Sequence, residues 1–178
     1  MERDRGLATR RLAVSAVLSA LGVVLLWGGA AFQVMDLAMA AIASFLVVFA
    51  VIEIRGAYPF LICAVTAVLS LLLLPIKTPA LAYAAFFGYY PIVKAALERR
   101  LRAALAWVVK VVAFALGGAA ALLVAAKVLL MDLSALYADW WIILLAAPVF
   151  VLYDVGLTRV ISAYLCRWRG RFRFLKLH

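Results

Sequence analysis

The sequence predicts an all-α polytopic membrane protein: a six-transmembrane-helix bundle with its N- and C-termini in the cytoplasm. Hydrophobic residues make up 70% of the 178-residue chain and charged residues only 15%, whereas a soluble domain carries about 45–50% apolar residues. A bilayer crossing takes roughly 20 apolar residues, so this length accommodates about six crossings with short connections. The composition therefore excludes a secreted or cytosolic globular enzyme, a disordered chain and a nucleic-acid-binding module.

A single membrane domain is expected over residues 1–178, with a basic juxtamembrane tail at its end. The predicted helices cover about residues 12–32, 37–54, 57–74, 80–97, 103–130 and 140–165, and the tail covers residues 167–178. The first apolar run follows a basic start, as a signal peptide would. It is about 20 residues long, however, where the apolar region of a signal peptide has about 7 to 15. We therefore expect a retained helix.

The boundaries between the first runs coincide with residues that end helices. Glu53, Arg55 and Gly56 separate the second run from the third, because charges mark the water boundary and glycine permits a turn. Pro75 and Pro79 follow the third run, and proline ends a helix because it lacks the N–H donor.

The last three runs carry their own boundary signals. Gly88 and Pro91 predict a kink in the fourth run, since Pro91 leaves the carbonyl of Phe87 without its helical donor. The fifth run is long enough to span with tilt. Trp140 and Trp141 begin the sixth run, as tryptophans do where a membrane helix meets the interface.

Lys and Arg lie mainly on one side of the predicted membrane. In the six-helix arrangement 13 of the 18 basic residues fall at the N-terminus, in the second and fourth connections or in the tail, and only Lys77 and Lys127 fall on the opposite side. The positive-inside rule then places both termini in the cytoplasm. The net charge of +10 is explained by this topology and by attraction to anionic membrane lipids.

Four charged residues lie within the apolar runs: Lys94, Lys110, Asp154 and Arg159. A charge near the middle of a membrane helix costs at least about 2.5–3.5 kcal/mol. One interpretation is an intramembrane network in which Asp154 pairs with Lys94 or Lys110 across helices. The alternative is that the basic side chains extend to the nearby interface and Asp154 neutralises one of them.

The first predicted helix carries a stripe of small residues. Ala16 and Ala20 stand one turn apart, and Ser15 and Ser19 repeat this spacing on the neighbouring face. Small side chains let another helix approach closely. The stripe serves either packing inside the monomer or contact with a partner helix.

A set of aromatic and polar residues predicts a small-molecule pocket toward the outer side, because such pockets combine apolar contact with a few orienting groups. The candidate ligand contacts are Trp27, Gln33, Thr66, Ser70, Tyr83 and Tyr137. Tryptophan and tyrosine near helix ends also serve as ordinary interfacial anchors. That reading stays open, above all for Trp27 and Tyr137.

Motifs for catalysis, metals and cofactors are missing from the sequence. It contains one histidine, one glutamine, no asparagine and two cysteines, and it has no Gly-rich phosphate loop, no HExxH and no GxSxG. We therefore expect no enzymatic activity, no metal and no cofactor.

Several segments resemble a known family of transport proteins. They are residues 11–24, RLAVSAVLSALGVV, residues 87–91, FGYYP, followed by Lys94, and the pair Tyr153-Asp154. With six closely spaced helices, they resemble the substrate-binding S components of energy-coupling factor (ECF) transporters, in an uncharacterised bacterial branch. The resemblance implies a six-helix fold that captures a vitamin or similar micronutrient from outside.

The resemblance also implies partners: a transmembrane T component and two cytoplasmic ATPases, which supply the energy. In that family an alanine-rich face of the first helix contacts the T component, and the matching positions here are Ala16 and Ala20. The connection after the first helix is short here, at about residues 33–36, and amide side chains are nearly absent. Both departures indicate an apolar or aromatic ligand.

A different class of function also fits the sequence. The chain is similar in size to the rod-shape protein MreD, a small polytopic scaffold of the bacterial cell envelope. In that reading its basic cytoplasmic faces recruit partner proteins.

Overall fold

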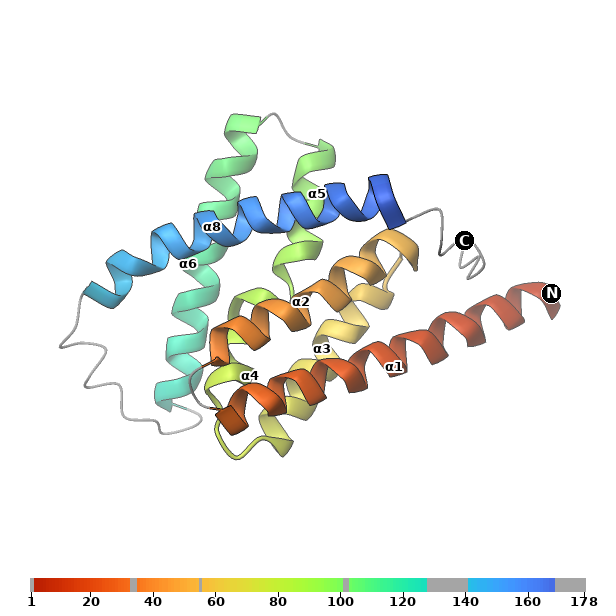
Figure 1. The fold of residues 1–178 in the computed structure, drawn as a ribbon, viewed down its shortest axis with the longest axis horizontal. Helices are drawn as coiled ribbons and strands as arrows, with labels where there is room; N and C mark the ends of the chain where they lie inside the picture. Colours follow the sequence, from red (N-terminus) through yellow and green to blue (C-terminus); the bar gives the residue numbers. More distant parts are fainter. Residues whose placement is uncertain (1, 33–34, 55, 101–102, 128–140, 169–178) are drawn as a thin grey trace. The chain divides into compact units, whose positions relative to one another are not determined.

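The computed structural model describes residues 2–32, 35–54, 56–100, 103–127 and 141–168. Every secondary-structure element in these ranges is a helix (Figure 1), which confirms the all-α class. In chain order the elements are α1 (Glu2–Phe32), α2 (Asp36–Glu53), α3 (Tyr58–Leu73), α4 (Thr78–Ala82), the π-helical turn η1 (Tyr83–Phe87), α5 (Tyr90–Arg100), α6 (Ala103–Lys127), α8 (Trp141–Ala163) and the π-helical turn η2 (Tyr164–Trp168).

Most of these helices are long and apolar enough to cross a bilayer. Five such stretches lie in the described residues: Gly6–Phe32, Asp36–Glu53, Thr78–Arg99, Leu105–Val124 and Ala147–Arg167. The helix α3 is also apolar but has only 16 residues, or about 24 Å at 1.5 Å per residue. This pattern is that of a multi-pass membrane protein.

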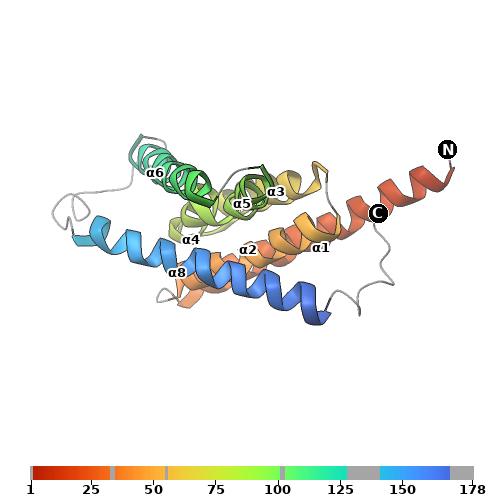
Figure 2. The same cartoon turned by 90° about the horizontal axis from the view of Figure 1, so that it is seen from above.

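The first helix is longer than its apolar run. It begins at Glu2, well before the apolar run that starts at Leu12, because hydropathy marks where a chain becomes apolar and not where its helical hydrogen bonding begins. The N-terminal end of α1 extends beyond α2 and α3 in both views (Figures 1 and 2).

The chain forms two compact units, one built mainly from residues up to Ala121 and the other from Leu122–Lys176. In the first unit α1 lies alongside both α2 and α3 (Figure 1). Glycines permit this approach: a Cβ on Gly22 would lie 2.8 Å from the methyl carbon of Thr66, and one on Gly29 would lie 3.0 Å from Cβ of Met39. Close contact through small residues is the usual means by which helices associate in a membrane.

The connection between α2 and α3 is a tight turn at a glycine. Gly56 has a φ of +69°, a conformation that glycine adopts at little cost. Glu53, which the sequence places at the water boundary, is buried at the end of α2. Pro59 is buried in the first turn of α3, where a proline needs no helical hydrogen bond.

The fourth apolar run is not one kinked helix but three consecutive segments, α4, η1 and α5. The disturbance begins before Pro91, at Tyr83, whose carbonyl accepts a hydrogen bond from the backbone N–H of Gly88 at 2.7 Å. This i to i+5 bond is the signature of a π-helical turn. Gly88 thus lies immediately after the widened turn, and Pro91 is the second residue of α5.

The second unit contributes α8 and η2. Pro148 lies inside α8, and η2 continues the helix as far as Trp168. The fifth predicted helix extends to about residue 130, and α6 is described as far as Lys127. Residues 128–140 and the tail after residue 168 lie outside the described residues.

Candidate functional site

The two faces of α1 that carry small residues differ in burial. Ser15 and Ser19 are buried, and the hydroxyl of Ser19 donates to the carbonyl of Ser15 at 2.9 Å. The hydroxyl of Thr66 in α3 donates to the carbonyl of Ser19 at 3.4 Å. Ala16 and Ala20, by contrast, are exposed. The serines therefore face the packing of the first unit, and the alanines lie on a surface that the described chain does not cover.

The candidate ligand contacts do not share one environment. Thr66, Ser70 and Tyr83 are at most 1% exposed, and the side chain of Trp27 is 57% exposed on the outer face of α1. Thr66 and Ser70 lie one turn apart on the same buried face of α3. Gln33 and Tyr137 lie outside the described residues.

Tyr83, the first residue of η1, is buried close to α3. A Cβ on Gly88 would lie 2.9 Å from the ring of Tyr83 and 2.8 Å from the Sγ of Cys63 in α3. The ring of Tyr83 and the thiol of α3 thus converge on a glycine that follows η1. Of the predicted contacts, Tyr83 and the buried face of α3 belong to the same interior, and Trp27 does not.

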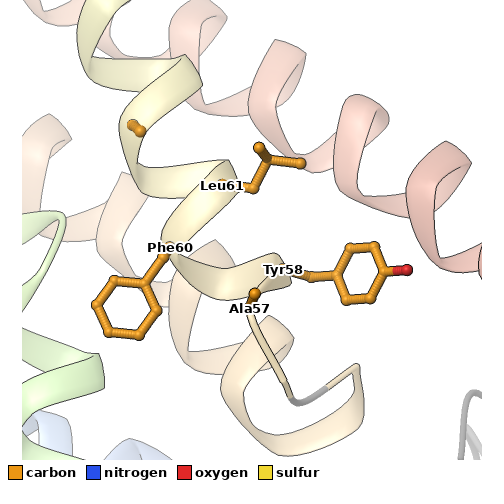
Figure 3. Close-up of a pocket in the computed structure, with 5 residues that line it drawn as sticks. Ala57, Tyr58, Phe60 and Leu61 are labelled. Carbon is orange, nitrogen blue, oxygen red and sulfur yellow. The ribbon is translucent and has the colours of Figure 1, made fainter.

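An apolar depression lies on another part of α3. It is lined by Ala57, Tyr58, Phe60, Leu61 and Ala64 at the start of the helix. Tyr58 and Phe60 extend from opposite sides of the first turns (Figure 3). None of the residues that line it is among the predicted ligand contacts.

Aromatic residues gather around η1 and attach α6 to it. The ring of Phe86 lies 5.0 Å from that of Phe114 in α6, edge to face, and 4.5 Å from that of Tyr90. The hydroxyl of Tyr89 donates to the carbonyl of Ala113 at 3.0 Å. Edge-to-face pairs of this kind add about 0.5–1.5 kcal/mol beyond the area they bury. Sequence reasoning missed Phe114 because a single phenylalanine in an apolar run carries no signal of its own.

Two of the predicted intramembrane charges meet at a carboxylate that the sequence analysis did not single out. Lys94 is 1% exposed and Lys110 is 4% exposed. Their Nζ atoms lie 2.9 Å and 2.8 Å from Oε1 of Glu98, whose side chain is 43% exposed. The ammonium group of Lys110 also lies 5.5 Å from the centre of the Trp107 ring. The i, i+4 spacing of Lys94 and Glu98 in the sequence could have predicted their ion pair.

The other two predicted charges belong to α8. Asp154 is 3% exposed, and its carbonyl accepts a hydrogen bond from the hydroxyl of Thr158 at 2.8 Å. Arg159 is exposed. Two members of the predicted network, Lys94 and Lys110, thus pair with Glu98, and this pairing lies within α5 and α6.

In the described part of the chain these groups contribute to helix association. Among the described residues no group of three or more His, Cys, Asp or Glu side chains is placed to hold a metal ion. The charged cluster joins α5 to α6, and the hydroxyl residues join α1 to α3. Among the surfaces that the described chain leaves exposed is the alanine face of α1.

No family model, curated protein or solved structure matches this chain.

Proposed function

We propose that this chain is the substrate-capture subunit of a bacterial micronutrient importer, similar to the S components of ECF transporters. In this proposal it lies in the inner membrane with both termini cytoplasmic. It binds a small apolar or aromatic molecule from the outer side. A T component and ATPase subunits supply the energy, and the chain itself hydrolyses nothing.

The observation that carries the proposal is the exposure of Ala16 and Ala20 on α1. Small side chains on an exposed face permit the backbone of a partner helix to approach closely. Ser15 and Ser19, which have the same spacing, are occupied by packing and hydrogen bonding within the first unit. The alanine stripe is therefore available for a T component, as the resemblance of residues 11–24 implies.

The buried face of α3 supports the ligand part of the proposal. The hydroxyl of Ser70 is buried and has no hydrogen-bond partner within the part of the chain that the structure describes. An unsatisfied buried polar group costs about 1–3 kcal/mol. We place the polar end of an otherwise apolar ligand at Ser70, with Thr66 and Tyr83 nearby in the same interior.

The experiment enlarges the alanine stripe and measures partner association. The double variant Ala16→Trp, Ala20→Trp is expressed in the native host and purified in mild detergent. We expect recovery of a copurifying T component to fall at least tenfold, because two indole rings hold the partner helix away. Both positions are exposed, so the variant should keep the parental thermal unfolding midpoint.

A matched control separates a specific face from general bulk. Val17→Trp with Leu21→Trp adds two indole rings at the same spacing, also on exposed positions of α1, but about 100° further around the helix than the alanine pair. This control should retain the partner. Recovery of cell-envelope proteins alone, with the alanine variant behaving as the parent, contradicts the transport proposal and favours the scaffold function.

A further inference from the structure

We propose that η1 is a joint in the fourth span with two alternative backbone geometries. Contacts with α6 hold this joint in the π-helical state. When the contacts between α5 and α6 are released, η1 converts to regular α-helical geometry and α5 rotates. The proposal concerns motion within the first unit and does not depend on which molecule the protein binds.

The first step of the argument is the hydrogen bonding around η1. The backbone N–H of Gly88 donates to the carbonyl of Tyr83 at 2.7 Å, five residues back. Regular bonding resumes when Val93 donates to the carbonyl of Tyr89 at 3.1 Å. Pro91 lies between and has no N–H to donate. The helix is therefore weakest over Gly88 to Pro91.

The second step is the size of the change that this joint allows. A π-helical turn holds one residue more than an α-helical turn of the same span. Conversion to α geometry therefore moves the following residues by one helical position, which is a rotation of about 100° and a shift of about 1.5 Å. Such a change is discrete, because intermediate registers leave backbone groups without partners.

The third step is that the segment before the joint is fixed. Pro79 and Ala80 of α4 and Tyr83, the first residue of η1, are less than 2% exposed, and α4 packs against α1, α2 and α3, while α5 packs against α2. The ring of Tyr83 lies close to Gly88 as well. A change of geometry in η1 is therefore expressed as movement of α5, not of α4.

The fourth step is that α6 holds residues within the joint and beyond it. Within it, the ring of Phe86 packs on Phe114, and Gly117 lies so near the carbonyl of Ala85 that a Cβ there would collide with it. Beyond it, the hydroxyl of Tyr89 donates to the carbonyl of Ala113.

An ion pair at the far end of α5 is the last of these contacts with α6. Oε1 of Glu98 lies 2.8 Å from Nζ of Lys110 in α6. A rotation of α5 by about 100° carries Glu98 and Tyr89 away from α6, so both contacts require the π-helical register. Residues 110, 113, 114 and 117 recur at the spacing of one helix face, and α6 thus presents one continuous edge to the joint.

Hydrogen–deuterium exchange on the full-length protein in lipid nanodiscs tests this coupling. Glu98→Gln removes the charge that binds Lys110, and Tyr89→Phe removes a single hydroxyl. We expect exchange of the amides in residues 83–93 to rise about tenfold in Glu98→Gln and about fivefold in Tyr89→Phe. Exchange in α2 and α3 should stay at the parental rate. Arg99→Gln, one residue beyond Glu98 and exposed, is the matched control and should leave exchange unchanged.

Two results overturn the proposal. One is parental exchange over residues 83–93 in Tyr89→Phe, which shows that α6 does not hold the joint. The other is an equal rise over residues 83–93, α2 and α3 in that variant, which shows general loosening. Tyr89→Phe decides the matter even if Glu98→Gln fails to fold. Deletion of Ala84, which removes the extra residue of η1, should slow exchange over residues 83–90; faster exchange there also overturns the proposal.

Discussion

Ser70 and Thr66 show how two similar side chains on one helix face can have different roles. Both are fully buried in α3. The hydroxyl of Thr66 donates to the carbonyl of Ser19 in α1 at 3.4 Å, whereas the hydroxyl of Ser70 is unpaired among the described residues. Thr66 therefore contributes to the association of α1 with α3. The hydroxyl of Ser70 is buried but forms no hydrogen bond within the described residues that would stabilise the fold.

Replacement of each hydroxyl separates structure from binding. Thr66→Val should lower the free energy of unfolding by about 1 kcal/mol, because the hydrogen bond from α3 to the carbonyl of Ser19 is lost. Ser70→Ala should leave it unchanged or raise it slightly, because no hydrogen bond is lost. If the proposed function holds, Ser70→Ala also reduces the amount of small molecule retained in native mass spectra. A large loss of stability in Ser70→Ala, measured by unfolding in detergent micelles, contradicts the assignment of Ser70 to ligand binding.

At the scale of elements, the contact between α1 and α3 depends on one glycine. A Cβ at Gly22 would lie 2.8 Å from the methyl carbon of Thr66, whereas a Cβ at Gly28 in the same helix would have no neighbour within 4 Å. Gly22→Leu should destabilise the first unit by about 1–3 kcal/mol, because extra volume forces the two helices apart. Gly28→Leu should be nearly neutral. Thermal unfolding of the two variants in the same detergent measures the difference, and equal midpoints contradict the packing described for α1.

The sequence predicts helix ends better than it predicts how a helix is interrupted. Glycine and proline act locally, so Gly56 and Pro75 mark the ends of α2 and α3 from composition alone. The π-helical geometry of η1 is not readable in this way. The residues that pack against it, Phe114 and Gly117 of α6, are distant in sequence and become its neighbours only in the fold.

In the candidate site, too, the features that depend on helix packing could not be predicted from the sequence. The exposure of Ala16 and Ala20 follows from the side of α1 on which α2 and α3 pack, and the sequence left both faces open. The partner of Lys94 and Lys110 was missed because Glu98 lies at the edge of the apolar run, where a carboxylate looks like an ordinary boundary residue. Only the position of α6 beside α5 brings Lys110 to it.

At the scale of the whole molecule, polar and apolar residues are distributed as expected for a protein surrounded by lipid. Within the described ranges, large apolar side chains such as Val24, Leu72 and Leu116 are more than 60% exposed. Charged and hydroxyl side chains such as Lys94, Ser44 and Thr66 are at most 1% exposed. A soluble protein rarely exposes apolar patches larger than a few hundred Å². The charge pattern, with 13 of 18 basic residues on one predicted side, predicts the orientation.

The orientation depends on whether the short helix α3 crosses the membrane. Six crossings place both termini on one side, and five crossings place them on opposite sides. With 16 residues α3 is about 24 Å long, against a hydrocarbon core of about 30 Å, and tyrosine near its start and Lys77 after its end allow for the mismatch at the interfaces. The ammonium group of Lys77 donates to the carbonyls of Leu71 and Leu74, so this cation caps α3 and adds little pull toward the cytoplasm.

Reporter fusions on either side of α3 test whether the chain crosses the membrane five or six times. Green fluorescent protein, which fluoresces only in the cytoplasm, is fused after Gly56 and after His178, and alkaline phosphatase, which is active only outside, is fused after Lys77. We expect fluorescence at both of the first two positions and phosphatase activity at the third, because the cationic segments stay inside while α3 crosses. A phosphatase fusion after Gly56 and a fluorescent fusion after Lys77 serve as reciprocal controls and should both be silent. Fluorescence after Lys77 together with loss of fluorescence after His178 means that α3 does not cross, and it contradicts the six-helix topology.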